Sequence, residues 1–353
     1  MYLNKYISCL FLVVLSLILP IVSLADTTPI VAVYFYVWYG NGLGSRHWND
    51  SPYTPVIDEP LIGYYSSLDP DTIEWQLRLL NDADIDVLFI SWRGPGSYED
   101  KATRLVFENL KRYGLKAAIL VEPWLGNDPN LYDSKWWSQV LDYIWRNYVE
   151  KYPEVYFYWE GKPLVLAFNP IGLNYRPMST IFTIRIVGND IDNAHYQDWD
   201  LWPDYLAPWT TFKDIVLRVR YDGYVAITPR FDDTIFCELG VRTSCDQRLI
   251  DPDYTIQAYV KQWEWILRNK DRIRLIAIYS WNEYHECSMI EPHYDSTKPK
   301  ELVYDPYFLT KSYTSLLRNV HSGLTNLNLN TITLTVLIFI VSMLSIYAYV
   351  KKE

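Results

Sequence analysis

Two glutamates three residues apart, Glu283 and Glu286, are the residues of this sequence with the clearest chemical use. They follow a short apolar run, 275–279, that is typical of a buried strand. In a continuing strand the two side chains would point to opposite faces. If the chain turns helically after the strand, they share a face, with Cβ atoms roughly 5–6 Å apart. That spacing suits two carboxylates that act together on one glycosidic bond.

The elements that must position these glutamates alternate between strand and helix. Apolar and β-branched runs predict strands at 31–37, 86–91, 115–121, 163–168, 181–187, 223–228 and 274–280, and the ambiguous segment 199–207 is the candidate for one more. Apolar residues at helical spacing predict helices at 71–81, 101–113, 135–152, 254–269 and 306–320. This alternation predicts an α/β fold, a (β/α)8 TIM barrel. A doubly wound open sheet is the alternative, but no glycine-rich phosphate loop follows any strand.

Polar and aromatic groups follow six of these strands. In a (β/α)8 barrel, active-site residues lie at the carboxyl ends of the strands and in the loops that follow. Any one of these groups could be a loop cap or a surface charge, but their convergence on one rim predicts a site. The groups are Trp38–Asn41 with Arg46–Trp48, Ser91–Arg93, Glu122–Trp124, Asp200 with Tyr205, Pro229–Asp233, and Asn282–Glu286.

Several of these stretches, taken in order, resemble glycoside hydrolase family 99, the endo-α-1,2-mannosidase type, and its family-99-like relatives. The matching stretches are 34–41, 47–49, 63–70, 91–92, 121–123 and 282–292, and they span about residues 30–315. The resemblance implies a (β/α)8 barrel and a retaining glycosidase that needs no metal or other cofactor.

The resemblance also assigns roles. Glu283 would be the base that deprotonates the substrate's 2-hydroxyl, and Glu286 the acid that protonates the leaving oxygen. The 2-oxygen would close on C1, giving a 1,2-anhydro sugar that water opens, so the substrate must be a 1,2-trans glycoside such as an α-mannoside. The substrate-binding residues would be Tyr36, Trp38, Tyr39, His47, Trp48, Trp92, Glu122, Tyr205, Asn282 and His285.

This chain departs from the family pattern at several positions. Tyr284 replaces a tryptophan of the glutamate motif, and Cys287 replaces a glycine. Arg93 stands where an aromatic residue is common. Arg93 indicates an anionic or differently shaped substrate, or it is a neutral packing residue or part of a salt bridge to a carboxylate. The changes keep both glutamates but leave specificity for mannan open.

The two ends of the chain predict export and anchoring. Residues 1–25 have the pattern of a secretory signal peptide, with an uncleaved anchor as the alternative. Residues 331–350 carry no charge, follow the polar linker 321–330 and precede the tail 351–353, so they predict a transmembrane helix rather than a buried core helix. The expected protein is a single-pass cell-membrane protein whose glycosidase-like domain, 26–320, is extracellular.

The amino-acid composition limits which classes of molecule the protein is expected to bind. A net charge of −10 without a basic patch argues against nucleic acid, and 15 Trp with 31 Tyr favour a glycan that stacks on aromatic rings. Cys237 and Cys245 either form a disulfide or remain two thiols, and Cys287 is interpreted as a packing residue. No CxxC or HExxH pattern indicates a bound metal.

These observations predict a membrane-anchored extracellular retaining glycoside hydrolase, endo-acting on α-mannose-containing glycans. One alternative is a family-99-like glycan-processing transferase or accessory protein. A second alternative is a non-catalytic carbohydrate-binding surface protein, against which the intact Glu283 and Glu286 argue.

Overall fold

The computed structural model describes residues 28–168, 176–188, 197–205, 215–245, 247–248, 252–296, 302–303 and 306–319. The predicted signal peptide (1–25), linker (321–330), transmembrane helix (331–350) and tail (351–353) lie outside these residues. Within the described residues, no helix is both long enough and apolar enough to cross a membrane. The chain divides into two compact units, and the one described below is Pro29–Leu316.

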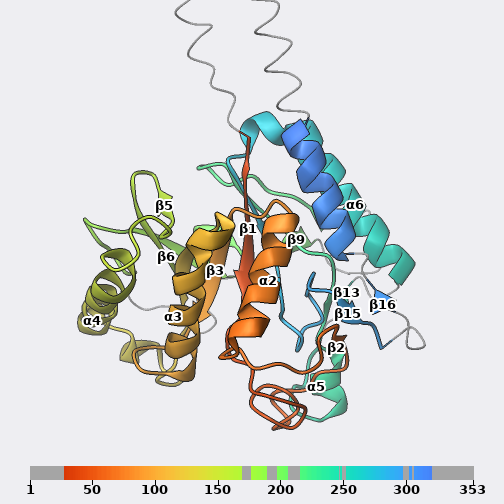
Figure 1. Ribbon diagram of the computed structural model, residues 1–353, viewed down its shortest axis with the longest axis horizontal. Helices are drawn as coiled ribbons and strands as arrows, with labels where there is room; N and C mark the ends of the chain where they lie inside the picture. The colour runs from red at the N-terminus through yellow and green to blue at the C-terminus, as the bar shows by residue number, and fades with distance from the viewer. Residues whose placement is uncertain are drawn as a thin grey trace, which may run out of the picture. The chain divides into compact units, whose positions relative to one another are not determined.

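Eight parallel strands form a nearly closed barrel, and the (β/α)8 prediction is confirmed (Figure 1). The register is continuous around β1, because Ala32 pairs with Ala277 on one side and with Val87 on the other. The strand order is β11 (Tyr224–Ile227), β14 (Leu275–Ile278), β1 (Ile30–Phe35), β3 (Val87–Trp92), β4 (Lys116–Val121), β6 (Lys162–Phe168), β7 (Thr183–Gly188) and β8 (Trp199–Asp200).

The barrel closes between β8 and β11 through side chains. The topology of the described residues contains no backbone ladder between these two strands. Instead, Trp199 stacks on Tyr224 with ring centroids 4.3 Å apart, and the Tyr224 hydroxyl donates to the Asp200 carbonyl at 2.5 Å. Arg220 adds an ion pair to the Asp200 carboxylate. We refer to these contacts as the seam.

Helices cover the outside of the barrel, and α2 and α3 pack side by side across β1 and β3 (Figure 1). Their starts are set by capping side chains, which accept from backbone N–H groups of the first turn: Asp69 caps α2, Ser97 caps α3 and Asp133 caps α4. The helices are α2 (Pro70–Asp82), α3 (Tyr98–Leu110), α4 (Ser134–Ile144), α5 (Thr234–Glu238), α6 (Pro252–Asn269) and a helix at 306–319.

Short elements decorate the barrel. They are β2 (Glu59–Pro60), β5 (Tyr158–Trp159), β9 (Asp204–Tyr205), β10 (Ile215–Val216), β12 (Phe231–Asp232), β13 (Gln247–Arg248), β15 (His293–Tyr294) and β16 (Leu302–Val303). The disulfide alternative is confirmed, because Cys237 in α5 is bonded to Cys245 in the segment after this helix. Cys287 is free and buried, and burial raises the pKa of its thiol, which fits a packing residue and not a nucleophile.

The barrel interior is filled by alternate residues of each strand, because successive side chains of a strand point to opposite faces. From β1, Ala32 and Tyr34 join a buried aromatic cluster with Phe89 of β3, Tyr224 of β11 and Ala277 of β14. The Tyr34 and Tyr224 hydroxyls lie 3.1 Å apart within it. This packed core leaves the carboxyl ends of the strands as the place for a site.

The predicted elements are confirmed with shifts at their ends. The 101–113 helix begins earlier, at Tyr98, and finishes as the 3₁₀ turn η1 (Lys111–Tyr113) before Gly114 at φ 67°. The 135–152 helix becomes α4 followed by the π-helical turn η3 (Trp145–Val149). The ambiguous segment 199–207 divides into β8 and β9, with residues beyond Tyr205 outside the description.

Candidate active site

The glutamate pair lies in the turn that follows β14. The Glu283 N–H donates to the Ser280 hydroxyl at 2.8 Å, and the Ser288 N–H donates back to the Glu283 carbonyl at 3.2 Å. The chain therefore leaves the strand before Glu283 and Glu286. This agrees with the expectation that the two glutamates lie in a turn and not in a continuing strand. The two carboxylates are close enough for the charge of Glu283 to affect the proton affinity of Glu286.

Glu286 has the properties of a proton donor. Burial, followed by the charge of Glu283, raises the pKa of Glu286 to about 7. The Tyr279 hydroxyl donates to Glu286 Oε2 at 2.6 Å and opposes this rise. Tyr279 in turn accepts from the Tyr36 hydroxyl at 3.3 Å. A carboxyl group that holds its proton near neutral pH suits a general acid.

Glu283 has a different environment. Its Oε1 accepts from His285 Nδ1 at 2.6 Å and from the His285 backbone N–H at 3.0 Å. The other ring nitrogen of His285 faces the His47 carbonyl at 3.1 Å. Because both ring nitrogens face acceptors, both carry protons and the ring is an imidazolium. Burial disfavours that charge, but Glu283 outweighs it and raises the pKa of His285.

Asn282 attaches the turn that carries the two glutamates to the residue that follows β1. Its Oδ1 accepts from the Tyr36 N–H and its Nδ2 donates to the Tyr36 carbonyl, both at 2.8 Å. Nδ2 also reaches the Tyr65 hydroxyl at 3.0 Å, and the Asn282 carbonyl accepts from Tyr39 at 2.6 Å. The side chain is fully buried. Its observed contacts therefore hold the turn in place.

A third carboxylate, Glu122, lies in the same cluster at the end of β4. The Ser91 hydroxyl donates to it at 2.5 Å, and Arg93 Nη2 lies 3.5 Å from it. Burial raises the pKa of Glu122, Arg93 and Ser91 oppose the rise, and the charge of Glu283 adds to it. Of the interpretations of Arg93, the structure contains the salt bridge to a carboxylate.

Aromatic rings from the segment that follows β1 surround the carboxylates. Trp38 lies 4.4 Å from Tyr36 and stacks on His47 at 4.7 Å, while the Arg93 guanidinium lies 5.1 Å above the Trp38 ring. Burial, with the positive charges of His285 and Arg93, lowers the pKa of His47 to about 2, so His47 is neutral. The predicted residues Tyr36, Trp38, His47 and His285 are thus brought together.

Three predicted residues have other positions. Trp92 does not join the cluster: it is buried in the helical layer, where its indole N–H donates to Asp100 at 2.9 Å. Trp48 is fully buried and stacks on Tyr39, with ring centroids 3.9 Å apart. Its ring therefore packs against other side chains and is not exposed to a ligand. Tyr205 lies in β9, paired with Ile215, and only its backbone is described.

Sequence reasoning missed two residues of the site. Tyr279 contacts Glu286, and strand parity could have found it, because it points inward like Leu275 and Ala277. Glu291, at the end of the same motif, is fully buried beneath the turn. It accepts four hydrogen bonds, from Gln76 at 2.6 Å, Trp281 at 3.1 Å, Tyr65 at 2.9 Å and Tyr284 at 2.8 Å.

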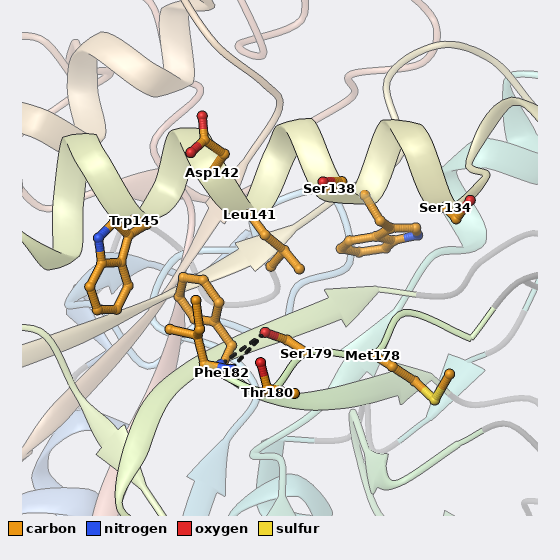
Figure 2. A pocket seen from close by; sticks show the side chains of 11 residues that line it. Ser134, Ser138, Leu141, Asp142, Trp145, Met178, Ser179, Thr180 and Phe182 are labelled. Atoms are coloured by element: carbon orange, nitrogen blue, oxygen red, sulfur yellow. Dashed lines mark hydrogen bonds between the residues drawn. The ribbon is translucent and has the colours of Figure 1, made fainter.

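Two surface grooves flank α4 and the turn η3 that follows it. Figure 2 shows the larger, of 770 Å³, where Leu141 of α4 and Trp145 of η3 face Phe182 near the start of β7. The smaller, of 450 Å³, includes Trp124 and Trp136. Neither groove is lined by a member of the carboxylate cluster. In the described part of the chain, no group of three or more His, Cys, Asp or Glu side chains is arranged to hold a metal.

The family model of glycosyl hydrolase family 99 matches residues 55–184. The chain is 26% identical over 140 residues to glycoprotein endo-alpha-1,2-mannosidase from Mus musculus, covering 30% of each chain. It is 22% identical over 293 residues to a glycoprotein endo-alpha-1,2-mannosidase-like protein from Mus musculus, covering 70% of this chain and 60% of that one. The first of these matches spans less than a third of its relative's length.

The fold agrees with this relationship. The solved structure of the GH99 endo-alpha-mannosidase from Bacteroides thetaiotaomicron matches with a TM-score of 0.56 at 18% identity, covering 83% of this chain and 98% of that chain. The chain is therefore similar to glycoside hydrolase family 99 proteins and their family-99-like relatives, with the family model matched over residues 55–184 and the barrel fold shared.

Proposed function

We propose that the protein hydrolyses α-mannose-containing glycans with retention of configuration, through a 1,2-anhydro sugar. The observation that carries this proposal is the unlike environment of the two glutamates. Glu286 is a carboxyl group whose pKa is raised to about 7, and Glu283 is a carboxylate against the His285 imidazolium. Two carboxyl groups with divergent environments are what an acid and base pair requires.

In the proposed first step, Glu283 removes the proton of the sugar 2-hydroxyl. The 2-oxygen forms a bond to C1 as the bond from C1 to the leaving oxygen breaks, and Glu286 gives its proton to that oxygen. In the second step Glu286, now ionised, takes a proton from water, which attacks C1. The bond between C1 and the 2-oxygen breaks, and Glu283 returns its proton to that oxygen. Two inversions at C1 give retention.

We further propose that the enzyme is endo-acting, anchored in the cell membrane by residues 331–350, and exported with its barrel outside the cell. The supports are the apolar composition of both ends and the Cys237–Cys245 disulfide. Disulfides form and persist mainly in oxidising compartments.

The test is hydrolysis of α-1,2-, α-1,3- and α-1,6-mannans by the full chain in detergent. The Glu283→Gln and Glu286→Gln variants run beside it, with Glu108→Gln as the matched control because Glu108 is exposed on α3. We expect cleavage that both site variants lose and the control keeps, with product sizes that separate endo from exo action. Failure of the parent to cleave any mannan, or cleavage that persists in both site variants, would refute the proposal.

A further inference from the structure

The smaller groove runs from the loops after β3 and β4 along α4 and into η3. It has a volume of 450 Å³ and combines aromatic rings with amide, carboxylate and guanidinium groups. Its lining residues are Pro95, Trp124, Trp136, Gln139, Val140, Asp142, Tyr143, Arg146 and Asn147. Helices that follow barrel strands begin at the carboxyl side of the barrel, so the amino end of α4 is on the side of the glutamate pair.

Two partly exposed indoles form the apolar part of the groove. Trp124 and Trp136 lie with ring centroids 4.8 Å apart at 48°. Each is supported by another ring, because Trp92 meets Trp124 edge-on at 5.5 Å and Tyr132 meets Trp136 edge-on at 4.8 Å. Supported indoles with a free side offer rigid faces on which the apolar C–H face of a sugar stacks.

Gly94 makes room for one of these indoles. A Cβ atom added at this glycine would lie 2.5 Å from Trp124 Cε2, well inside van der Waals contact. The φ of Gly94 is +94°, a conformation that residues with a Cβ rarely adopt. The position of Trp124 over the loop after β3 therefore depends on glycine at this point.

Polar side chains border the indoles. The Gln139 side chain is exposed and makes no hydrogen bond to the described part of the chain. Arg146 donates to Asp142 at 3.0 Å, and both side chains are more than half exposed. Aromatic faces bordered by a few amide and charged groups are the chemistry that binds sugar rings and their hydroxyls.

The groove is continuous in sequence with the carboxylate cluster through two neighbouring loops. Trp124 is two residues beyond Glu122, and Pro95 is two residues beyond Arg93. Arg93 and Glu122 contact each other at 3.5 Å. The groove therefore begins within two residues of the carboxylate cluster along both loops.

We propose that this groove binds a distal part of the glycan chain, with sugar rings stacked on Trp124 and Trp136. The inference rests on the proposed function and adds that the substrate is an extended chain. The larger groove on the other face of α4 provides a matched comparison, because it is lined by Trp137 and Trp145 but faces the segment Met178–Phe182.

The test compares a long soluble α-mannan with a short α-mannoside of two sugar rings. Trp124→Ala, Trp136→Ala and the control Trp145→Ala are made in the full chain. We expect each groove variant to lose about tenfold in kcat/KM on the long chain, about 1.4 kcal/mol, mostly through KM, and far less on the short substrate. Trp124→Phe, which keeps a ring, restores most of the loss, and Gly94→Ala reproduces it.

Three outcomes would overturn the inference and leave the proposed function standing. The groove variants could lose kcat/KM equally on the two substrates, they could lose none on either, or Trp145→Ala could show the same loss. Retardation of each protein in a gel containing soluble α-mannan provides a readout that needs no turnover. Failure of the parent to cleave either substrate would refute the proposed function. In that case retardation of the parent that Trp124→Ala abolishes still supports the groove, and retardation that Trp124→Ala retains overturns it.

Discussion

Removing the Tyr279 hydroxyl tests whether Glu286 is the acid. Tyr279→Phe deletes a hydrogen bond of 2.6 Å to Glu286 Oε2 and a weaker contact of 3.3 Å from Tyr36. The phenylalanine ring keeps the packing against Tyr34 and Trp202, with centroids at 5.7 and 5.1 Å. The change therefore acts on the proton affinity of Glu286 with little loss of apolar contact.

The sign and size of the effect follow from the charge state that the bond stabilises. The hydroxyl donates to the ionised carboxylate and lowers the pKa of Glu286, so its removal raises that pKa above about 7. A hydrogen bond to a charged group contributes about 1.5–3 kcal/mol, part of which the protonated form also gains. A net difference of about 1.4 kcal/mol corresponds to about one pKa unit.

The assay is kcat/KM for α-mannan against pH. Because the acid must be protonated to act, its ionisation sets the alkaline limb of the profile. We expect Tyr279→Phe to move that limb upward by about one pH unit. Tyr36→Phe, which removes only the bond into Tyr279, should move it less. An unchanged limb, a downward shift, or an equal shift in both variants would contradict the assignment of Glu286 as the acid.

Two other expectations concern stability. Burial raises the pKa of Glu291 to about 7, so its contribution to stability is fully present at acidic pH and is lost as the pH rises through about 7. Glu291→Gln should lower the free energy of unfolding at pH 5 by about 1–3 kcal/mol. It should also flatten the decline in melting temperature between pH 5 and 8. A decline as steep as in the parent protein counts against this account. Replacing Cys237 and Cys245 together by alanine should cost roughly 2.5 kcal/mol in denaturant titrations while mannan cleavage persists. A loss of cleavage at temperatures where the variant is folded would show that the disulfide positions the site.

The fold could be predicted from local patterns because most barrel strands are continuous apolar runs. The run of β4, for example, is buried at all but its first residue. The sixth strand could not be assigned with the same certainty, because β8 contains only Trp199 and Asp200. Its place in the barrel depends on contacts with Tyr224, which is distant in the sequence.

The site residues that lie next to one another in the sequence could be predicted. Those whose place depends on which face of a strand they point to were harder to predict. Glu283, His285 and Glu286 share one turn, so their grouping was visible in the sequence. Trp92 was grouped with them as a neighbour of Ser91, but alternate strand residues face opposite sides. Ser91 faces Glu122, and Trp92 consequently faces Asp100 in the helical layer.

The seam gives this barrel a property that a ring of eight backbone ladders lacks. A ladder fixes the relative register of two strands through regularly spaced hydrogen bonds, and closure by ladders leaves no sheet edge. Here side chains join the edges of β8 and β11 instead, through the stacking of Trp199 on Tyr224 and the Arg220–Asp200 ion pair. Such a fastening can open while the other seven strand pairings remain intact. Unfolding of the barrel thus has a defined starting line, at the free edge of β11, whose other edge pairs with β14, the strand that leads into the turn with Glu283 and Glu286.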